Sequence, residues 1–212
     1  MSPETISVAL QVAALIFAVC VHESAHGAAA LWCGDPTARD LGRISLNPLR
    51  HLDPFGSVVL PAMLAFSGAP VFGWARPVPV VLARTRDPKL ANLLVSAAGP
   101  LSNVLLAILF AVVATRIRSV EAAGALAVPI LWFAVYSVIV NVALAVFNLL
   151  PVPPLDGFGV LEGILPRSLD GVTATIRRLG MPILLALIFT GALNGILRPA
   201  QRAAIGWLLG RP

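Results

Sequence analysis

The chain has 212 residues, of which 58% are hydrophobic and only 12% are charged. A soluble core of this size does not need so much apolar surface, so the composition excludes an ordinary soluble globular domain and indicates an integral membrane protein. The net charge of +5 comes almost entirely from arginines scattered through the connecting segments. This pattern suits lipid headgroups better than a nucleic-acid surface, so we expect contact with the lipid bilayer and no nucleic-acid partner.

Four apolar runs are near or above the length of about 20 residues that a membrane-spanning helix needs. They are residues 6–32, 90–114, 123–150 and 181–197. A fifth run, residues 56–67, would rise only about 18 Å as a helix, which is short of a hydrocarbon core about 30 Å thick. The sequence therefore predicts an all-α polytopic membrane protein with about four transmembrane helices and one re-entrant segment.

The connecting segments 37–54 and 73–82 mix β-branched residues, prolines and arginines without a helical period. This composition favours short β-strands at the membrane surface. Seven of the fifteen lysines and arginines lie between Asp35 and Lys89, and none precedes Ile6. By the positive-inside rule this region is cytoplasmic, and the first helix runs from the outside to the inside.

The first apolar run contains the motif HESAH, residues 22–26. His22 and His26 are four positions apart, so on a helix both imidazoles project from one face and can bind one metal ion. Glu23 is not aimed along that line, which suits it to act as a general base on a metal-bound water. Ionisable groups in lipid cost about 2.5 to 3.5 kcal/mol each on insertion scales, and a divalent cation would satisfy all three. A water-filled ion path is the alternative explanation.

A catalytic zinc site commonly has three protein ligands and one open position, so another part of the chain must supply the third ligand. The candidates are His51, Asp53, Asp87, Glu121, Asp156, Glu162 and Asp170. Asp156 is favoured because it follows the third apolar run in FNLLPVPPLDG, where three prolines make the backbone irregular near the membrane boundary. If residues 56–67 do not cross, Asp156 returns to the side of His22 and His26. For His51, in a polar loop, a solvated role is favoured.

Two asparagines carry amide groups that must be paired in lipid. Asn148 lies eight positions before Asp156 and could face the same cleft. Asn103 follows Gly99-Pro100, which lets another backbone approach closely. Both are candidates for substrate binding or oxyanion stabilisation, with a tie between helices as the alternative for each. For Asn141 the tie is favoured.

Together, HESAH at 22–26, GPLSN at 99–103 and FNLLPVPPLDG at 147–157 resemble the site-2 protease family of intramembrane zinc metalloproteases. The resemblance is to the compact prokaryotic form without a PDZ or CBS domain. It implies one Zn²⁺ ion, and it assigns a role to each candidate side chain. The zinc ligands would be His22, His26 and Asp156, the catalytic residue Glu23, and the residues near the substrate Asn148 and Asn103.

The resemblance also implies the function, which is hydrolysis of peptide bonds within or near transmembrane segments of substrate proteins. We expect a single intramembrane metalloprotease domain over 1–212, with a catalytic core of about 6–32, 90–114 and 123–157 and a C-terminal helix of about 181–197. The implied location is the prokaryotic inner (plasma) membrane, with the active site towards the cytoplasm, and a homo-oligomer is compatible with the sequence. Segment 42–46 or 75–80 could hold an unwound substrate by strand pairing. The alternative function is a transporter that conducts protons or metal ions.

Overall fold

The computed structural model describes residues 2–68, 74–118 and 126–210. These residues form helices and connecting segments, and no β-strand occurs in the described ranges. The long helices are α1 (Pro3–Trp32), α4 (Pro88–Arg118), α5 (Ala127–Asn148), α7 (Asp170–Phe189) and α8 (Ala192–Leu209). The short ones are α2 (Thr37–Asp40), η1 (Pro48–Arg50), η2 (Pro54–Val59), α3 (Leu60–Ser67), η3 (Leu82–Arg84), α6 (Asp156–Ile164) and η4 (Arg167–Leu169). The predicted helical membrane architecture is confirmed.

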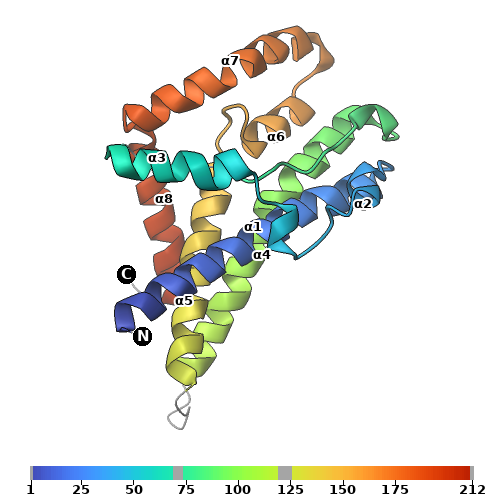
Figure 1. Cartoon of the computed structure of the whole chain (residues 1–212). Coiled ribbons are helices and arrows are strands. Elements are labelled where there is room, and N and C mark those ends of the chain that lie inside the picture. The colour runs from blue at the N-terminus through green and yellow to red at the C-terminus, as the bar shows by residue number, and fades with distance from the viewer. Residues whose placement is uncertain (1, 69–73, 119–125, 211–212) are drawn as a thin grey trace.

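Helices α1, α4 and α5 pack against one another at the centre of the molecule (Figure 1). Buried alanines lie on all three helices, namely Ala14, Ala18, Ala107, Ala111, Ala134 and Ala145. Small side chains let helix backbones approach closely, which favours association in lipid, where the hydrophobic effect does not drive it. Each of the three helices is long and apolar enough to cross a membrane, as the first three long runs predict.

The bounds predicted for the fourth helix, residues 181–197, are wrong. The chain turns at Gly191, whose φ of 71° lies in the left-handed region, so that α7 ends at Phe189 and α8 begins at Ala192. Glycine adopts this conformation without steric cost. Because the residues on both sides of Gly191 are apolar, the sequence does not show that the helix ends there. The fourth helix that is long and apolar enough to span is Arg167–Phe189, which includes α7. In Figure 1, α7 runs across the top of the view, whereas α8 runs down beside α5.

The segments expected to form surface strands contain short helices and extended chain instead. Helices α2 and η1 occupy part of 37–54, and residues 74–81 are extended without pairing to a strand; residue 73 lies outside the described ranges. Prolines at 77 and 79 remove two of the N–H donors that a ladder would use. The strand prediction is therefore not confirmed.

His51 is buried, contrary to the expectation of a solvated side chain. It is 2% exposed, and its Nε2 donates to the carbonyl oxygen of Ser45 at 2.6 Å. The carbonyl oxygen of His51 accepts from the N–H of Arg76 at 2.8 Å. A polar loop that folds back on itself can bury its own imidazole in this way, because the loop supplies the hydrogen-bond acceptor. His51 thus joins the two connecting segments.

Asp35 anchors the second connecting segment to the end of α1. Its buried carboxylate accepts from the N–H of Thr37 at 3.0 Å and from the N–H of Val81 at 2.6 Å. Burial alone would raise the pKa of Asp35. A hydrogen bond from the Thr37 hydroxyl, the two backbone hydrogen bonds and the nearby charge of Arg84 outweigh burial and lower the pKa below its usual value. The folded state therefore favours the ionised form.

We expect Asp35→Asn to destabilise the protein by about 1 to 3 kcal/mol near neutral pH, because charge-assisted hydrogen bonds are lost. The folded pKa of Asp35 lies below the unfolded value of about 3.9, so its stabilising contribution is full above about pH 4. It is lost as the pH falls through the folded pKa. Thermal unfolding in detergent at a series of pH values should show the difference between wild type and variant shrinking at acid pH. A difference that stays constant with pH would contradict this assignment.

Candidate metal centre

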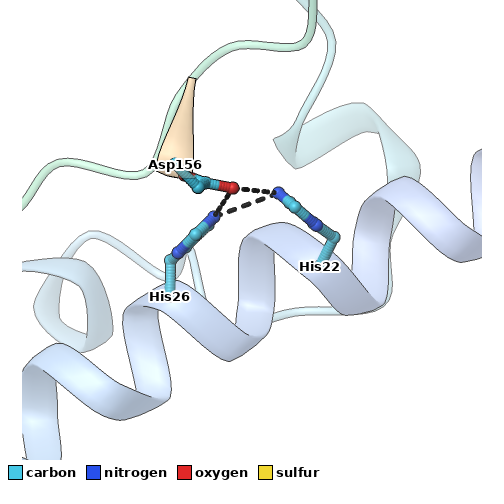
Figure 2. Close-up of side chains that lie close together, drawn as sticks. All are labelled: His22, His26 and Asp156. Atoms are coloured by element: carbon cyan, nitrogen blue, oxygen red, sulfur yellow. Dashed lines mark hydrogen bonds and ion pairs between the residues drawn. The ribbon is translucent and has the colours of Figure 1, made fainter. Parts of the chain in front are cut away.

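The two motif histidines lie one turn apart on α1 and point toward the same spot (Figure 2). Their Nε2 atoms are 3.1 Å apart, and the rings meet edge to face with centroids 4.7 Å apart. Both side chains are buried, at 6% exposure for His22 and 9% for His26. The i, i+4 spacing of a helix accounts for this arrangement.

Asp156 approaches the histidines from the first residue of α6. Its Oδ2 lies 3.2 Å from Nε2 of His22 and 3.4 Å from Nε2 of His26 (Figure 2). The three ligand atoms all lie within 4.8 Å of one another. The favoured third ligand is therefore the acidic residue that the fold brings to the histidines.

Glycines on α6 bring Asp156 close to α4. A Cβ on Gly159 would lie 2.1 Å from Oγ of Ser96, and one on Gly163 would lie 2.5 Å from Cβ of Leu93. Both contacts are too short for any residue other than glycine, so α6 rests directly on α4. This close packing fixes the position of Asp156 relative to the two histidines on α1.

The protons on the two imidazoles point away from the centre. Nδ1 of His22 donates to Oδ1 of Asn103 at 2.6 Å, and Nδ1 of His26 donates to the carbonyl oxygen of Val95 at 2.7 Å. In the neutral tautomers both Nε2 atoms then carry lone pairs that face Oδ2 of Asp156. This oxygen is buried and has no hydrogen-bond partner among the described residues. Three lone pairs without a shared proton fit a bound cation, and two imidazoles with one carboxylate are a ligand set that suits zinc.

Asn103 lies behind His22, on the side away from Asp156. Its Nδ2 donates to Oδ1 of Asn141 at 2.8 Å, and the Nδ2 of Asn141 donates to the carbonyl oxygen of Ser137 at 2.8 Å. Asn103 and Asn141 are both fully buried. A chain of hydrogen bonds thus links α1, α4 and α5 through the imidazole of His22, and it fixes the orientation of that ring.

Gly99 gives α4 room to pass beside the imidazoles. A Cβ at this position would lie 2.4 Å from Nε2 of His26 and 2.6 Å from Cε1 of His22. Real Cβ atoms do not approach ring atoms so closely, and both rings are already held from behind. Any larger residue must therefore displace them.

We expect Gly99→Ala to lower zinc affinity by at least about 10- to 100-fold, the cost of disturbing the surroundings of a metal ligand. Zinc content of the purified protein after dialysis against a weak chelator would measure this. Gly171→Ala on α7 is the matched control, because nothing lies within 4 Å of a Cβ there. Full zinc content in Gly99→Ala would show that the histidines are not held as described.

Glu23 lies beside the histidine pair on α1. It is half-buried, and its Oε2 accepts a hydrogen bond from the N–H of Val78 at 3.1 Å. The extended segment 74–81 thus passes next to the carboxylate that the HESAH motif suits to act as a base. This contact was not predicted, because a backbone donor leaves no signal in a sequence.

Asn148, the substrate-side candidate, and the acidic residues considered as alternatives to Asp156 have contacts elsewhere. Nδ2 of Asn148 donates to the carbonyl oxygen of Leu144 on its own helix at 3.0 Å. Asp53 and Asp87 accept from backbone N–H groups at helix starts, Glu162 pairs with Arg177, and Asp170 pairs with Lys89. Glu121 lies outside the described residues.

Comparison with known proteins gives a consistent picture. Residues 117–191 match the model of peptidase family M50. The protein named "Putative zinc metalloprotease YwhC" of Bacillus subtilis is 37% identical over 191 residues, which cover 89% of this chain and 84% of that protein. Proteins named "Putative zinc metalloprotease Rip2" are 30% identical in Mycolicibacterium smegmatis and 32% identical in Mycobacterium tuberculosis, each over 87% of this chain and 68% of the relative. No solved structure matches the chain.

Proposed function

Because this chain belongs to peptidase family M50, the site-2 protease family, we propose that it hydrolyses peptide bonds within or near transmembrane segments of other proteins. The chain is a membrane-embedded zinc metalloprotease, and its relatives do not support the ion-transport alternative. The observation that carries the proposal is the convergence of ligand atoms from His22, His26 and Asp156, with the imidazole protons directed away from them.

His22, His26 and Asp156 are the residues that we propose to hold zinc. Zinc, when bound, would supply a Lewis acid that polarises the scissile carbonyl and lowers the pKa of a bound water towards about 7. The chain's own contribution is to keep both Nε2 atoms free of protons and to bury the site. Asn103 contributes by orienting His22, and because both ends of its buried amide are engaged, we propose this positioning role and the tie between helices in place of a substrate-side role.

Glu23 is the residue that we propose to move the proton. It accepts a proton from the attacking water and donates one to the amine nitrogen as the peptide C–N bond breaks. Since Oε2 is held by Val78, Oε1 is the oxygen that we assign to this transfer. Asn148 is proposed to bind the substrate backbone through the oxygen of its amide, because its nitrogen already donates to Leu144.

The substrate-pairing hypothesis favours one of the two candidate segments. In segment 75–80, the N–H groups of Arg76 and Val78 donate within the protein, and positions 77 and 79 are prolines. This segment therefore has few donors left for a substrate strand. In residues 42–46 the N–H groups of Gly42, Arg43 and Ser45 also donate within the protein, which leaves those of Ile44 and Leu46. These two stand at alternate positions, as the donors along one edge of a strand do, so we assign the pairing to residues 42–46.

The topology of the proposed protease follows from charge. With the basic segment 35–89 in the cytoplasm, the zinc site faces that side of a prokaryotic inner membrane, and residues 56–67 enter and leave on the same side. We propose that residues 1–212 act as a single intramembrane metalloprotease domain.

The experiment that tests the function is cleavage of a transmembrane protein substrate by the purified protein in detergent, with the cut site mapped by mass spectrometry. Cleavage within or beside the transmembrane segment, lost on zinc chelation and regained on adding zinc, is the expected result. The alternative is tested with the same preparation in lipid vesicles. Proton or zinc flux through vesicles, with no cleavage of a panel of transmembrane substrates, would overturn the proposal.

A further inference from the structure

The carboxylate of Glu23 is held by a single peptide group. Its Oε2 accepts from the N–H of Val78 at 3.1 Å, and Val78 stands between two prolines that have no N–H to offer. A glutamate side chain has three rotatable bonds, whereas a general base must stay within hydrogen-bond reach of the proton that it transfers. The position of the Val78 N–H therefore decides where this carboxylate rests.

The same peptide group is held on its other side by Arg43. A peptide unit is planar, so the carbonyl of Pro77 and the N–H of Val78 move as one body and point in opposite directions. Nη2 of Arg43 donates to the carbonyl oxygen of Pro77 at 3.1 Å and to that of Arg76 at 2.7 Å. The Pro77-Val78 peptide is thus clamped between a guanidinium and the carboxylate of Glu23.

Arg43 is buried, and its guanidinium forms no ion pair in the described part of the chain. It is 7% exposed, and its Nη1 donates to the carbonyl oxygen of Arg50. Burial lowers the pKa of Arg43, as do the charges of Arg76 and Arg50, while the charge of Glu23 raises it. Glu23 is thus the nearby anion that stabilises the charge of Arg43, and the Pro77-Val78 peptide group lies between the two side chains.

Hydrogen bonds in series strengthen one another. A cation at the carbonyl end polarises the peptide, which makes its N–H a better donor to the anion at the other end. Other hydrogen bonds that hold segment 74–81 include those from the N–H of Trp74 to Gly56, from the N–H of Arg76 to His51 and from the N–H of Val81 to Asp35. They fix the ends of the segment, whereas Arg43 fixes the peptide that touches Glu23.

We propose that Arg43 is a positioning residue for Glu23 and acts through the Pro77-Val78 peptide group. This inference rests on the proposed protease function, in which Glu23 moves the proton. The guanidinium of Arg43 contacts carbonyl oxygens of the protein and none of the three ligand atoms. Arg43 also lies in the segment assigned to substrate pairing, but that pairing uses backbone groups, which a change of the side chain leaves in place. Loss of the guanidinium should therefore affect the rate of the chemical step more than the binding of zinc or substrate.

The test compares Arg43→Gln, Val78→Pro and the double variant with wild type. Arg43→Gln removes the guanidinium, and Val78→Pro removes the N–H from a chain that is already extended between prolines. Each single change should lower kcat about 10- to 100-fold, the size of effect that a displaced catalytic group produces, with KM within about twofold and zinc content unchanged. Arg39→Gln is the matched control, because Arg39 is exposed and pairs with Asp40.

The double variant separates positioning from general support of the fold. If Arg43 acts through the Val78 N–H, the double variant should be no slower than the slower single variant. Two losses that multiply, or a kcat of Arg43→Gln equal to that of wild type, would overturn the proposal. If Arg43→Gln does not fold, Arg43→Lys can replace it, because lysine keeps the positive charge but lacks the planar set of guanidinium donors. The kcat of Arg43→Lys should then lie between those of wild type and Val78→Pro.

A second readout does not depend on protease activity. Hydrogen–deuterium exchange of a peptide covering residues 74–81 should be about 10-fold faster in Arg43→Gln and unchanged in Arg39→Gln, because the Val78 N–H is released. Unchanged exchange in Arg43→Gln would overturn the clamp even if the protein is an active protease. Conversely, normal zinc binding and altered exchange in a protein that cuts no substrate would leave the clamp in place and remove the proposed function.

Discussion

Replacing Glu23 by glutamine is expected to abolish cleavage and to leave the zinc content unchanged. Glutamine has nearly the same shape, and its oxygen can still accept from the N–H of Val78, so the segment beside it stays in place. It cannot accept a proton at neutral pH, and loss of a general base typically costs about 10²- to 10⁴-fold in rate. The measurement is kcat on a transmembrane substrate together with metal analysis of the same sample.

Glu4→Gln is the matched control for this prediction, because it makes the same chemical change on an exposed residue of the first turn of α1. It should leave both cleavage and zinc unchanged. If Glu23→Gln cut the substrate at the rate of wild type, another group would have to move the proton.

Asp156→Ala is expected to abolish both zinc binding and cleavage. It removes one of the three converging ligand atoms and leaves two imidazole nitrogens facing each other at 3.1 Å. Because changes behind a ligand already cost about 10- to 100-fold in metal affinity, loss of a ligand itself should cost more than about 100-fold. Competition with a fluorescent zinc chelator would measure the affinity directly.

Asp170→Ala serves as the control, since Asp170 is an exposed carboxylate that pairs with Lys89 at the surface. It should bind zinc as wild type does. Retention of zinc in Asp156→Ala would mean that the third ligand comes from another residue. Zinc binding would then have to be measured after replacing each of the other acidic residues in turn.

The sequence predicts the parts of this site that depend on helical spacing and on crossing parity. The i, i+4 spacing places His22 and His26 on one face. Asp156 stands out among seven candidates because it follows an apolar run in a proline-rich segment at the membrane boundary, and the parity of the crossings agrees with that choice. The first argument uses the regular geometry of a helix, and the second uses the depth at which a crossing ends. This explains why they locate the cluster without any tertiary information.

Other parts depend on tertiary contacts that no local pattern encodes. The N–H of Val78 and the carbonyl of Val95 are backbone groups, which every residue carries, so their use by Glu23 and His26 has no signature. His51 is buried by the fold of its own loop, although its neighbours are polar. The break at Gly191 lies inside an apolar run whose composition is that of a continuous helix.

The hydrogen-bond chain from His22 through Asn103 to Asn141 makes metal affinity and helix association a single linked equilibrium. Whatever separates α1 from α4 must also break the hydrogen bond to Asn103 that orients the imidazole of His22, a proposed zinc ligand. A metal ion bound at this site would add its binding free energy to the cohesion of all three helices. The resistance of the bundle to unfolding should then rise with free zinc by up to about 1.4 kcal/mol for each tenfold increase above the dissociation constant. In a membrane poor in available zinc, the protein would lose cohesion together with activity.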